Sequence, residues 1–72
     1  MKIGFVIYND LTALDFVGVY GPITRLKTMG FKKDLEWEIC SYSEEVSDIN
    51  GLQFIPNKVK PPLDEYDLVI VP

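Results

Sequence analysis

Hydrophobic residues gather in two uninterrupted runs, one near each end of the chain. Residues Lys2–Tyr8 read KIGFVIY and Asp67–Pro72 read DLVIVP, and neither run alternates with polar residues. A strand with one solvated face would alternate, so both runs predict strands that are buried on both faces. Strands of this kind are typical of parallel sheets.

Between about Ala13 and Met29 the hydrophobic period becomes that of a helix. Apolar residues recur every three or four positions, with charged residues between them near the end. We expect one amphipathic helix, with Thr12 as its N-cap and Gly30 as its C-terminal stop. Pro22 should bend this helix or loosen its first turns. The apolar positions are Phe16, Val19, Tyr20, Ile23 and Leu26.

The middle of the chain predicts β structure followed by a loop. Residues Leu35–Ser43 alternate in polarity, which indicates a strand with one drier face. The pair Asn50-Gly51 lies between two β-prone stretches and predicts a hairpin. Two prolines then start a loop, and the LDEY segment at 63–66 is expected to form a short helical turn.

The order of these elements is strand, helix, strand, hairpin, strand. Two doubly buried strands around a helix imply a parallel sheet with a right-handed βαβ connection. The expected fold is α/β, a flavodoxin-like three-layer sandwich. Such a sheet needs helices on both faces, and the sequence offers one good helix. We therefore expect residues 1–72 to be the N-terminal part of a single larger domain, and to be marginally stable and prone to self-association when isolated.

Composition narrows the functional classes. The chain has 72 residues and a net charge of −4, so no basic face is expected to bind nucleic acid. It has no histidine, which excludes a His-ligated zinc and Ser-His or Cys-His catalysis within these residues. Its single cysteine fits a reducing cytoplasm. The apolar runs are too short to span a bilayer, and the N-terminus lacks the pattern of a signal peptide, so no membrane association is expected.

Asp15 is the candidate catalytic residue. In open parallel sheets, sites form at the carboxyl ends of the strands, and Asp15 lies where the first strand leads into the helix. Its neighbours Leu14, Phe16 and Val17 are apolar, a setting that favours the protonated carboxyl and suits general acid–base catalysis. The alternative is that Asp15 only caps the helix or complements its dipole.

Other residues with chemical potential favour structural roles. Cys40 lies in the middle of a strand, away from any helix N-terminus or cationic neighbour, and is expected to be a packed structural cysteine. Gly18 and Gly21 fall within the helix and do not form a dinucleotide-binding turn. No basic groove accompanies the aromatic residues, so they are expected in the core: Trp37, Tyr42 and Phe54. Three acidic residues are expected in a solvated loop: Glu44, Glu45 and Asp48.

The segment IGFVIYNDLTALDFVGVYGPITRL resembles the start of the ThiJ/PfpI superfamily, a group of class I glutamine-amidotransferase-like proteins. The nearest branch is the isonitrile hydratase-like one, whose domain also forms the N-terminal half of some AraC-type transcription regulators. Its pattern Leu-Asp-x-x-Gly-Pro-x-Glu/Asp is matched from Leu14 to Gly18. The closing DLVIVP resembles the family strand that runs into a Pro-Gly-Gly turn. The resemblance covers essentially the whole chain and less than half of a family domain.

The resemblance implies a catalytic role for Asp15. In the family, this acidic residue hydrogen-bonds a reactive cysteine that lies well downstream, at a strained strand-to-helix turn. Cys40 does not match that cysteine. This sequence departs from the family pattern at two positions near the start of the helix. Val19 stands where the family has a proline after Gly18, and Gly21 stands where the family has the acidic residue two positions later.

Three functions follow from the resemblance. The first is a cysteine-dependent, isonitrile hydratase-like enzyme that acts on a small-molecule substrate and needs no cofactor or metal. The second is the ligand-sensing domain of an AraC-type regulator, and the third is a deglycase-like stress protein. The family also implies a homodimer in the cytoplasm. These 72 residues alone are not expected to be active.

Overall fold

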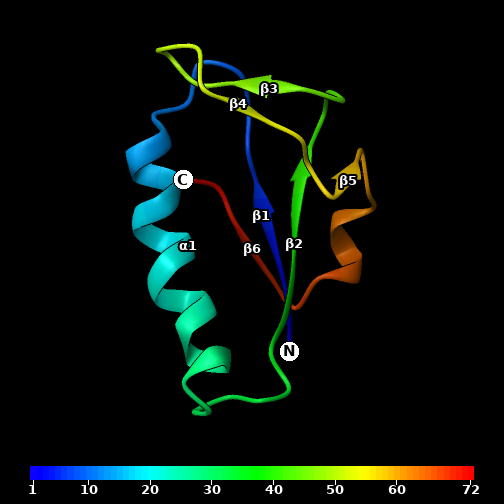
Figure 1. Cartoon of the computed structure of the whole chain (residues 1–72). Helices are drawn as coiled ribbons and strands as arrows, with labels where there is room; N and C mark the ends of the chain where they lie inside the picture. Colours follow the sequence, from blue (N-terminus) through cyan, green and yellow to red (C-terminus); the bar gives the residue numbers. More distant parts are fainter.

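A parallel sheet of four strands forms the centre of the structure, a computed structural model that describes residues 1–72 (Figure 1). The strand order is β5-β2-β1-β6. The strands are β1 (Lys2–Val6), β2 (Glu36–Ser41), β5 (Lys58–Val59) and β6 (Leu68–Ile70). Helix α1 (Ala13–Thr28) crosses between β1 and β2. The predicted α/β, flavodoxin-like parallel fold is therefore confirmed.

Strand β1 lies between β2 and β6, which explains its unbroken apolar run. Its residues Ile3, Gly4 and Phe5 are all buried, so both faces of the strand are covered. On one face, the ring of Phe5 lies 6.1 Å from that of Phe16 and 5.3 Å from that of Tyr20 in α1. On the other face, the ring of Tyr66 packs against Gly4. The prediction that β1 is buried on both faces is confirmed, and on the face without a helix the ring of Tyr66 supplies the cover at Gly4.

Strand β6 differs from the prediction at Asp67–Pro72. It is three residues long, and Leu68 is 44% exposed. It pairs with β1 on one side only and forms an edge of the sheet. The hydrophobic run thus forms an edge strand that is partly uncovered, because length and polarity alone do not distinguish an edge strand from a central one.

Helix α1 spans the predicted residues and continues through Pro22. Thr12 occupies the N-cap position, but its side chain makes no capping hydrogen bond; its carbonyl oxygen accepts one from the amide of Asp15, at 3.0 Å. Gly30, with φ of +82°, follows the C-cap and stops the helix as expected. No helix of the structure has the length and hydrophobicity needed to cross a bilayer.

The predicted hairpin is present as strands β3 (Val46–Ser47) and β4 (Gln53–Phe54). Gly51 has φ of +91° in its turn, a conformation that favours glycine. The carboxylate of Asp48 accepts hydrogen bonds from the amides of Asn50, at 2.9 Å, and Leu52, at 2.7 Å. Asp48 is only 8% exposed, so its placement in a solvated loop is corrected: it organises the turn.

The hairpin packs on the loop between β1 and α1, at the upper end of the sheet in Figure 1. The amide of Asp10 donates a hydrogen bond to the carbonyl of Ser47 at 2.8 Å, and the amide of Ile49 donates one to the carbonyl of Leu11 at 2.9 Å. The side chain of Asn9 accepts from the amide of Ser47 at 3.0 Å. The hairpin therefore fixes the loop that leads into the helix carrying Asp15.

Two further short segments, one helical and one extended, complete the fold. The predicted helical turn is present as the 3-10 helix η1 (Leu63–Glu65), and it lies across the sheet from α1 in Figure 1. Strand β5 was not predicted; its two residues pair with Cys40 and Ser41 of β2. Two residues are too few to show a period in the sequence.

Candidate functional site

The carboxyl ends of the strands carry the candidate site. Tyr8 follows β1, and its hydroxyl donates a hydrogen bond to the carbonyl of Pro72, beyond the end of β6. Ser41 ends β2, and its hydroxyl donates to the carbonyl of Ser43. These contacts fix the ends of β1, β2 and β6 around the point where open parallel sheets bind ligands.

Asp15 lies in the first turn of α1, at this end of the sheet, and its side chain is exposed. Its neighbour Leu14 is 77% exposed and Val17 is also exposed, whereas Phe16 is buried in the core. The buried, apolar surroundings expected for Asp15 are therefore absent, because Leu14 and Val17 point away from the core and Asp15 is itself exposed. A carboxylate here faces solvent and is favoured by the helix dipole. Its catalytic role stays a prediction.

A cavity of about 330 Å³ opens near the ends of β1 and β2. Its nine lining residues include Val6, Cys40, Tyr42 and Leu63, and Asp15 is not among them. Val6 and Cys40 belong to the face of the sheet opposite α1, because side chains alternate along a strand and their neighbours Phe5 and Ile39 pack toward the helix. The cavity and Asp15 thus lie on different sides of the sheet.

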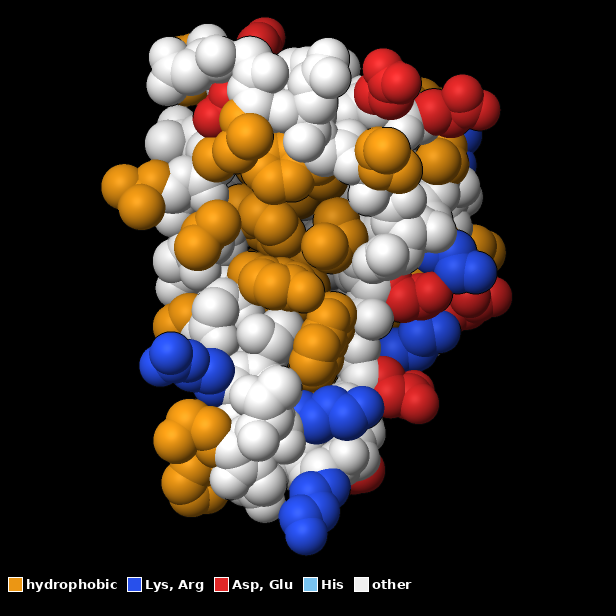
Figure 2. Space-filling view, in the orientation of Figure 1, with side chains coloured by type: hydrophobic (Ala, Val, Ile, Leu, Met, Phe, Trp, Pro, Cys, Tyr) orange, Lys and Arg blue, Asp and Glu red, His pale blue; other side chains and the backbone are white.

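Tyr42 lines this cavity and is 79% exposed. Its predicted place in the core is wrong, because β2 ends at Ser41 and the chain turns away. Trp37 and Phe54 are half-buried and pack against the core, as expected. In the space-filling view, hydrophobic side chains form a continuous column down the centre of the face shown (Figure 2).

A buried polar network lies beneath the cavity. The thiol of Cys40, which is buried, donates a hydrogen bond to the Tyr66 hydroxyl at 3.2 Å. That hydroxyl donates to the carboxylate of Glu38 at 2.9 Å. Burial, together with the hydrogen bonds to Cys40 and Glu38, raises the pKa of Tyr66 well above its usual range. Tyr66 is therefore protonated and serves as a hydrogen-bond donor. Cys40 is buried and hydrogen-bonded to Tyr66, as expected for a structural cysteine.

Two lysines complete the network around Glu38. The Nζ of Lys2 lies 3.2 Å from this carboxylate and the Nζ of Lys58 lies 3.8 Å from it. Lys2 Nζ also lies 5.3 Å from the centre of the Tyr66 ring. The hydrogen bond from Tyr66 and these two cations hold the pKa of Glu38 below its ordinary value of 4.5, although desolvation opposes them. The network joins β1, β2, β5 and the segment before β6.

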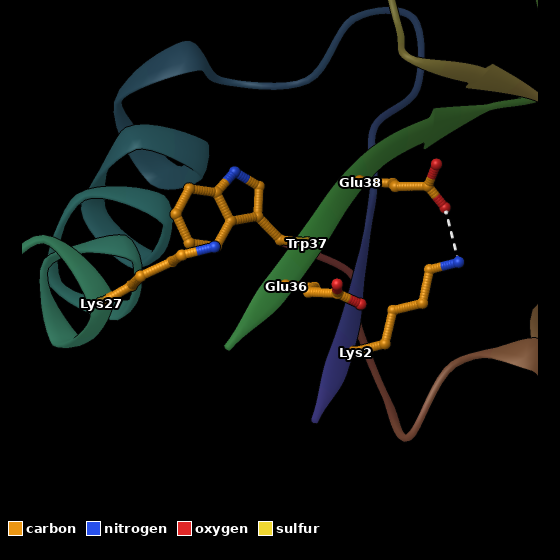
Figure 3. Close-up of a pocket in the computed structure, with 5 residues that line it drawn as sticks. All are labelled: Lys2, Lys27, Glu36, Trp37 and Glu38. Atoms are coloured by element: carbon orange, nitrogen blue, oxygen red, sulfur yellow. Dashed lines mark ion pairs between the residues drawn. The ribbon is translucent and has the colours of Figure 1, made fainter. Parts of the chain in front are cut away.

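A second cavity, of about 380 Å³, lies toward the opposite ends of these strands (Figure 3). The side chain of Lys27 in α1 lies beside the Trp37 ring, with its Nζ 5.7 Å from the ring centre. Glu36, Glu38 and Lys2 lie on the other side of β2. This cavity surrounds the start of β2, at the amino ends of the strands, and two of its four charged residues, Glu38 and Lys2, pair with each other. It is not the crevice in which such sheets bind ligands.

Sequence reasoning missed Tyr66 and Lys60, which shape the side of the sheet opposite α1. One signal for Tyr66 was present: Gly4 interrupts a run of bulky residues, and a glycine within a strand marks the close approach of another group. Nothing in the sequence distinguishes Lys60 from the other lysines.

The Glu38 network predicts a pH-dependent stability. Because the pKa of Glu38 is lowered on folding, its contribution is present above about pH 4.5 and is lost as the pH falls through the folded-state value. We expect Glu38→Gln to reduce the free energy of unfolding at pH 7. Between pH 5 and pH 3, the free energy of unfolding of this variant should decrease less than that of the original chain. Urea unfolding followed by circular dichroism measures both quantities. The exposed Glu44→Gln is the control, and the same acid response in both variants would contradict the prediction.

Comparison with known proteins shows a likeness in structure but none in sequence. No family model matches the chain, and neither does any curated protein. Among solved structures, the chain is similar to an AraC family transcriptional regulator from Pseudomonas putida, with a TM-score of 0.80 and 15% sequence identity. The match covers 97% of this chain and 44% of that one. At this identity the likeness shows a shared fold, and the chain spans less than half of the neighbour's length.

Proposed function

We propose that residues 1–72 form the N-terminal part of a larger ThiJ/PfpI-like domain that senses a small molecule in an AraC-type transcription regulator. The observation that carries the proposal is the match of almost the whole chain to a regulator of that family at a TM-score of 0.80. The open edge of β6 supports it, because a larger parallel sheet has room to continue there. The complete protein would be a cytoplasmic homodimer, with its DNA-binding part outside these residues.

The test is to determine the coding sequence beyond Pro72 and to assay the complete protein. We expect a basic C-terminal extension with two helix-turn-helix patterns, and binding of the protein to its own promoter DNA in a fluorescence anisotropy assay. A coding sequence that ends after one α/β domain, with a cysteine at a strand-to-helix turn, would contradict the regulator and support the enzyme.

The second candidate is a cysteine-dependent, isonitrile hydratase-like enzyme, and the position of Asp15 favours it. Asp15 is an exposed carboxylate beside the carboxyl end of β1, where it has access to a reactant bound over the sheet. In the proposed reaction, Asp15 takes the thiol proton of a cysteine outside this segment, the thiolate attacks the isonitrile carbon, and Asp15 returns the proton to that carbon, which gives a thioimidate. Water then adds to the thioimidate carbon and the C–S bond breaks. One proton of the water goes to the nitrogen and the other, through Asp15, to the departing thiolate, so the product is a formamide. No cofactor or metal takes part.

For this enzyme we expect Asp15→Asn in the complete protein to reduce kcat at least about 100-fold, because a positioned acid–base group contributes on that scale. The fold should persist, since Asp15 is exposed. Steady-state turnover of an alkyl isonitrile and a circular dichroism spectrum measure the two effects. Asp64→Asn, an exposed acidic residue in η1, is the matched control. Full turnover in Asp15→Asn would return Asp15 to the role of a helix-dipole partner.

A further inference from the structure

We propose that the cavity near the carboxyl ends of β1 and β2 binds a small apolar carboxylate, whose anionic group pairs with Lys60. This site is separate from the catalytic role proposed for Asp15: it lies on the face of the sheet opposite α1, and Asp15 does not line it. It can therefore be confirmed or overturned whether the protein is a regulator or an enzyme.

The walls of the cavity are mostly apolar. Val6 of β1 and the sulfur-bearing side chain of Cys40 in β2 come from the sheet, while Pro61 and Leu63 come from the segment after β5. The Cys40 thiol is already used, because it donates its hydrogen bond to Tyr66. The walls therefore offer hydrophobic contact to a ligand, which is the usual composition of a small-molecule site.

Lys60 is the only charged residue in the lining, and it has no carboxylate partner. Lys2 and Lys58 behave differently, because both pair with Glu38. The Nζ of Lys60 lies instead 4.8 Å from the centre of the Tyr42 ring, which also lines the cavity. A cation on an aromatic ring at the side of an apolar cavity is available to an incoming anion.

The backbone at Lys60 is constrained in a way that fixes this arrangement. Its φ is +52°, a left-handed conformation that is uncommon for a residue with a side chain. Its amide donates to the carbonyl of Ser41 at 2.8 Å, and Pro61 follows it directly. Such conformations persist where the surrounding structure holds them, and they occur often at ligand sites. Here the conformation coincides with the one unpaired cation of the cavity.

Volume and charge together set the class of ligand. A volume of about 330 Å³ lies at the lower end for small-molecule sites, so the ligand is small. One cation and few free polar groups suit a single negative charge on an alkyl or aryl body. A phosphate ester or another dianion would need more hydrogen-bond donors than the lining supplies.

The test uses 4-fluorobenzoate and its neutral analogue 4-fluorobenzyl alcohol, each titrated into the full chain and observed by fluorine NMR. We expect saturable broadening with the benzoate and about tenfold weaker binding of the alcohol, because the alcohol lacks the charged contact to Lys60. Lys60→Gln should weaken benzoate binding about tenfold and leave the alcohol unaffected. The exposed Lys32→Gln is the charge-matched control and should bind benzoate as the original chain does.

A second variant separates the cavity from its charge. Leu63→Trp places a larger side chain at a partly exposed wall position and should abolish the binding of both compounds without unfolding the chain. The proposal is overturned if benzoate shows no saturable broadening, or if Lys60→Gln binds it as well as Lys32→Gln does. Unchanged binding in Leu63→Trp would also overturn it, since the ligand would then lie elsewhere.

Discussion

Phe5→Ala is expected to lower the free energy of unfolding by about 3–5 kcal/mol, because it empties the centre of the core. Phe5 has no exposed surface and belongs to the main hydrophobic cluster. Its ring meets those of Phe16 and Tyr20 edge-on, and α1 cannot move into the space without losing these contacts. The loss equals the whole stability that a core of this size supplies, about 3–5 kcal/mol, so the variant should be largely unfolded.

Urea unfolding followed by circular dichroism at 25 °C measures this loss. The control is Phe31→Ala, which removes the same ring from a largely exposed position and should change stability by about 0.5 kcal/mol or less. Equal effects in the two variants would show that α1 does not pack on β1 through the Phe5 ring.

Gly4→Val is expected to lower the free energy of unfolding by about 1–3 kcal/mol, the usual range for overpacking. A Cβ atom at Gly4 would lie 3.0 Å from Cγ of Tyr66. The ring cannot simply move away, because its hydroxyl is held between Cys40 and Glu38. The substitution therefore either strains the strand or breaks the polar network.

Gly18→Ala is the matched control for this prediction. Nothing lies within 4 Å of a Cβ atom at Gly18, which is in the interior of α1. That variant should gain about 0.5–1 kcal/mol, because alanine is the better helix former. Denaturation curves of both variants test the pair, and a Gly4→Val variant as stable as the original chain would rule out the packing of Tyr66 on β1.

The elements that could be predicted from the sequence are those with a hydrophobic run, a helical period or a turn signal. Strand β1 was predicted from an unbroken apolar run, helix α1 from a helical period over sixteen residues, and the β3–β4 hairpin from Asn50-Gly51. Strand β5 was missed because its two residues show no period and no Asn-Gly turn marks them. Strand β6 was identified as a strand, but its partial exposure depends on its having one neighbour, which is a property of the sheet and not of the segment.

The candidate site was predicted less completely, for a related reason. The chain order places Asp15 after β1, so its position near the carboxyl end was predictable. The exposure of its neighbours was not, because Leu14 and Val17 fall on the outer side of a helix that packs mainly through Phe16. The environments of Tyr66 and Lys60 arise from contacts across more than fifteen residues of sequence, such as Tyr66 with Glu38, and local patterns do not encode them.

The position of β1 in the sheet also determines when the protein can fold. Both partners of this strand come later in the chain: β2 begins at Glu36 and β6 at Leu68. Until residue 70 has left the exit tunnel, one edge of this buried strand has no backbone partner. Pairing of segments so distant in sequence is slow to form. The nascent chain is thus exposed to misassembly until β6 emerges, and a chaperone that covers residues 2–7 would protect it during that interval.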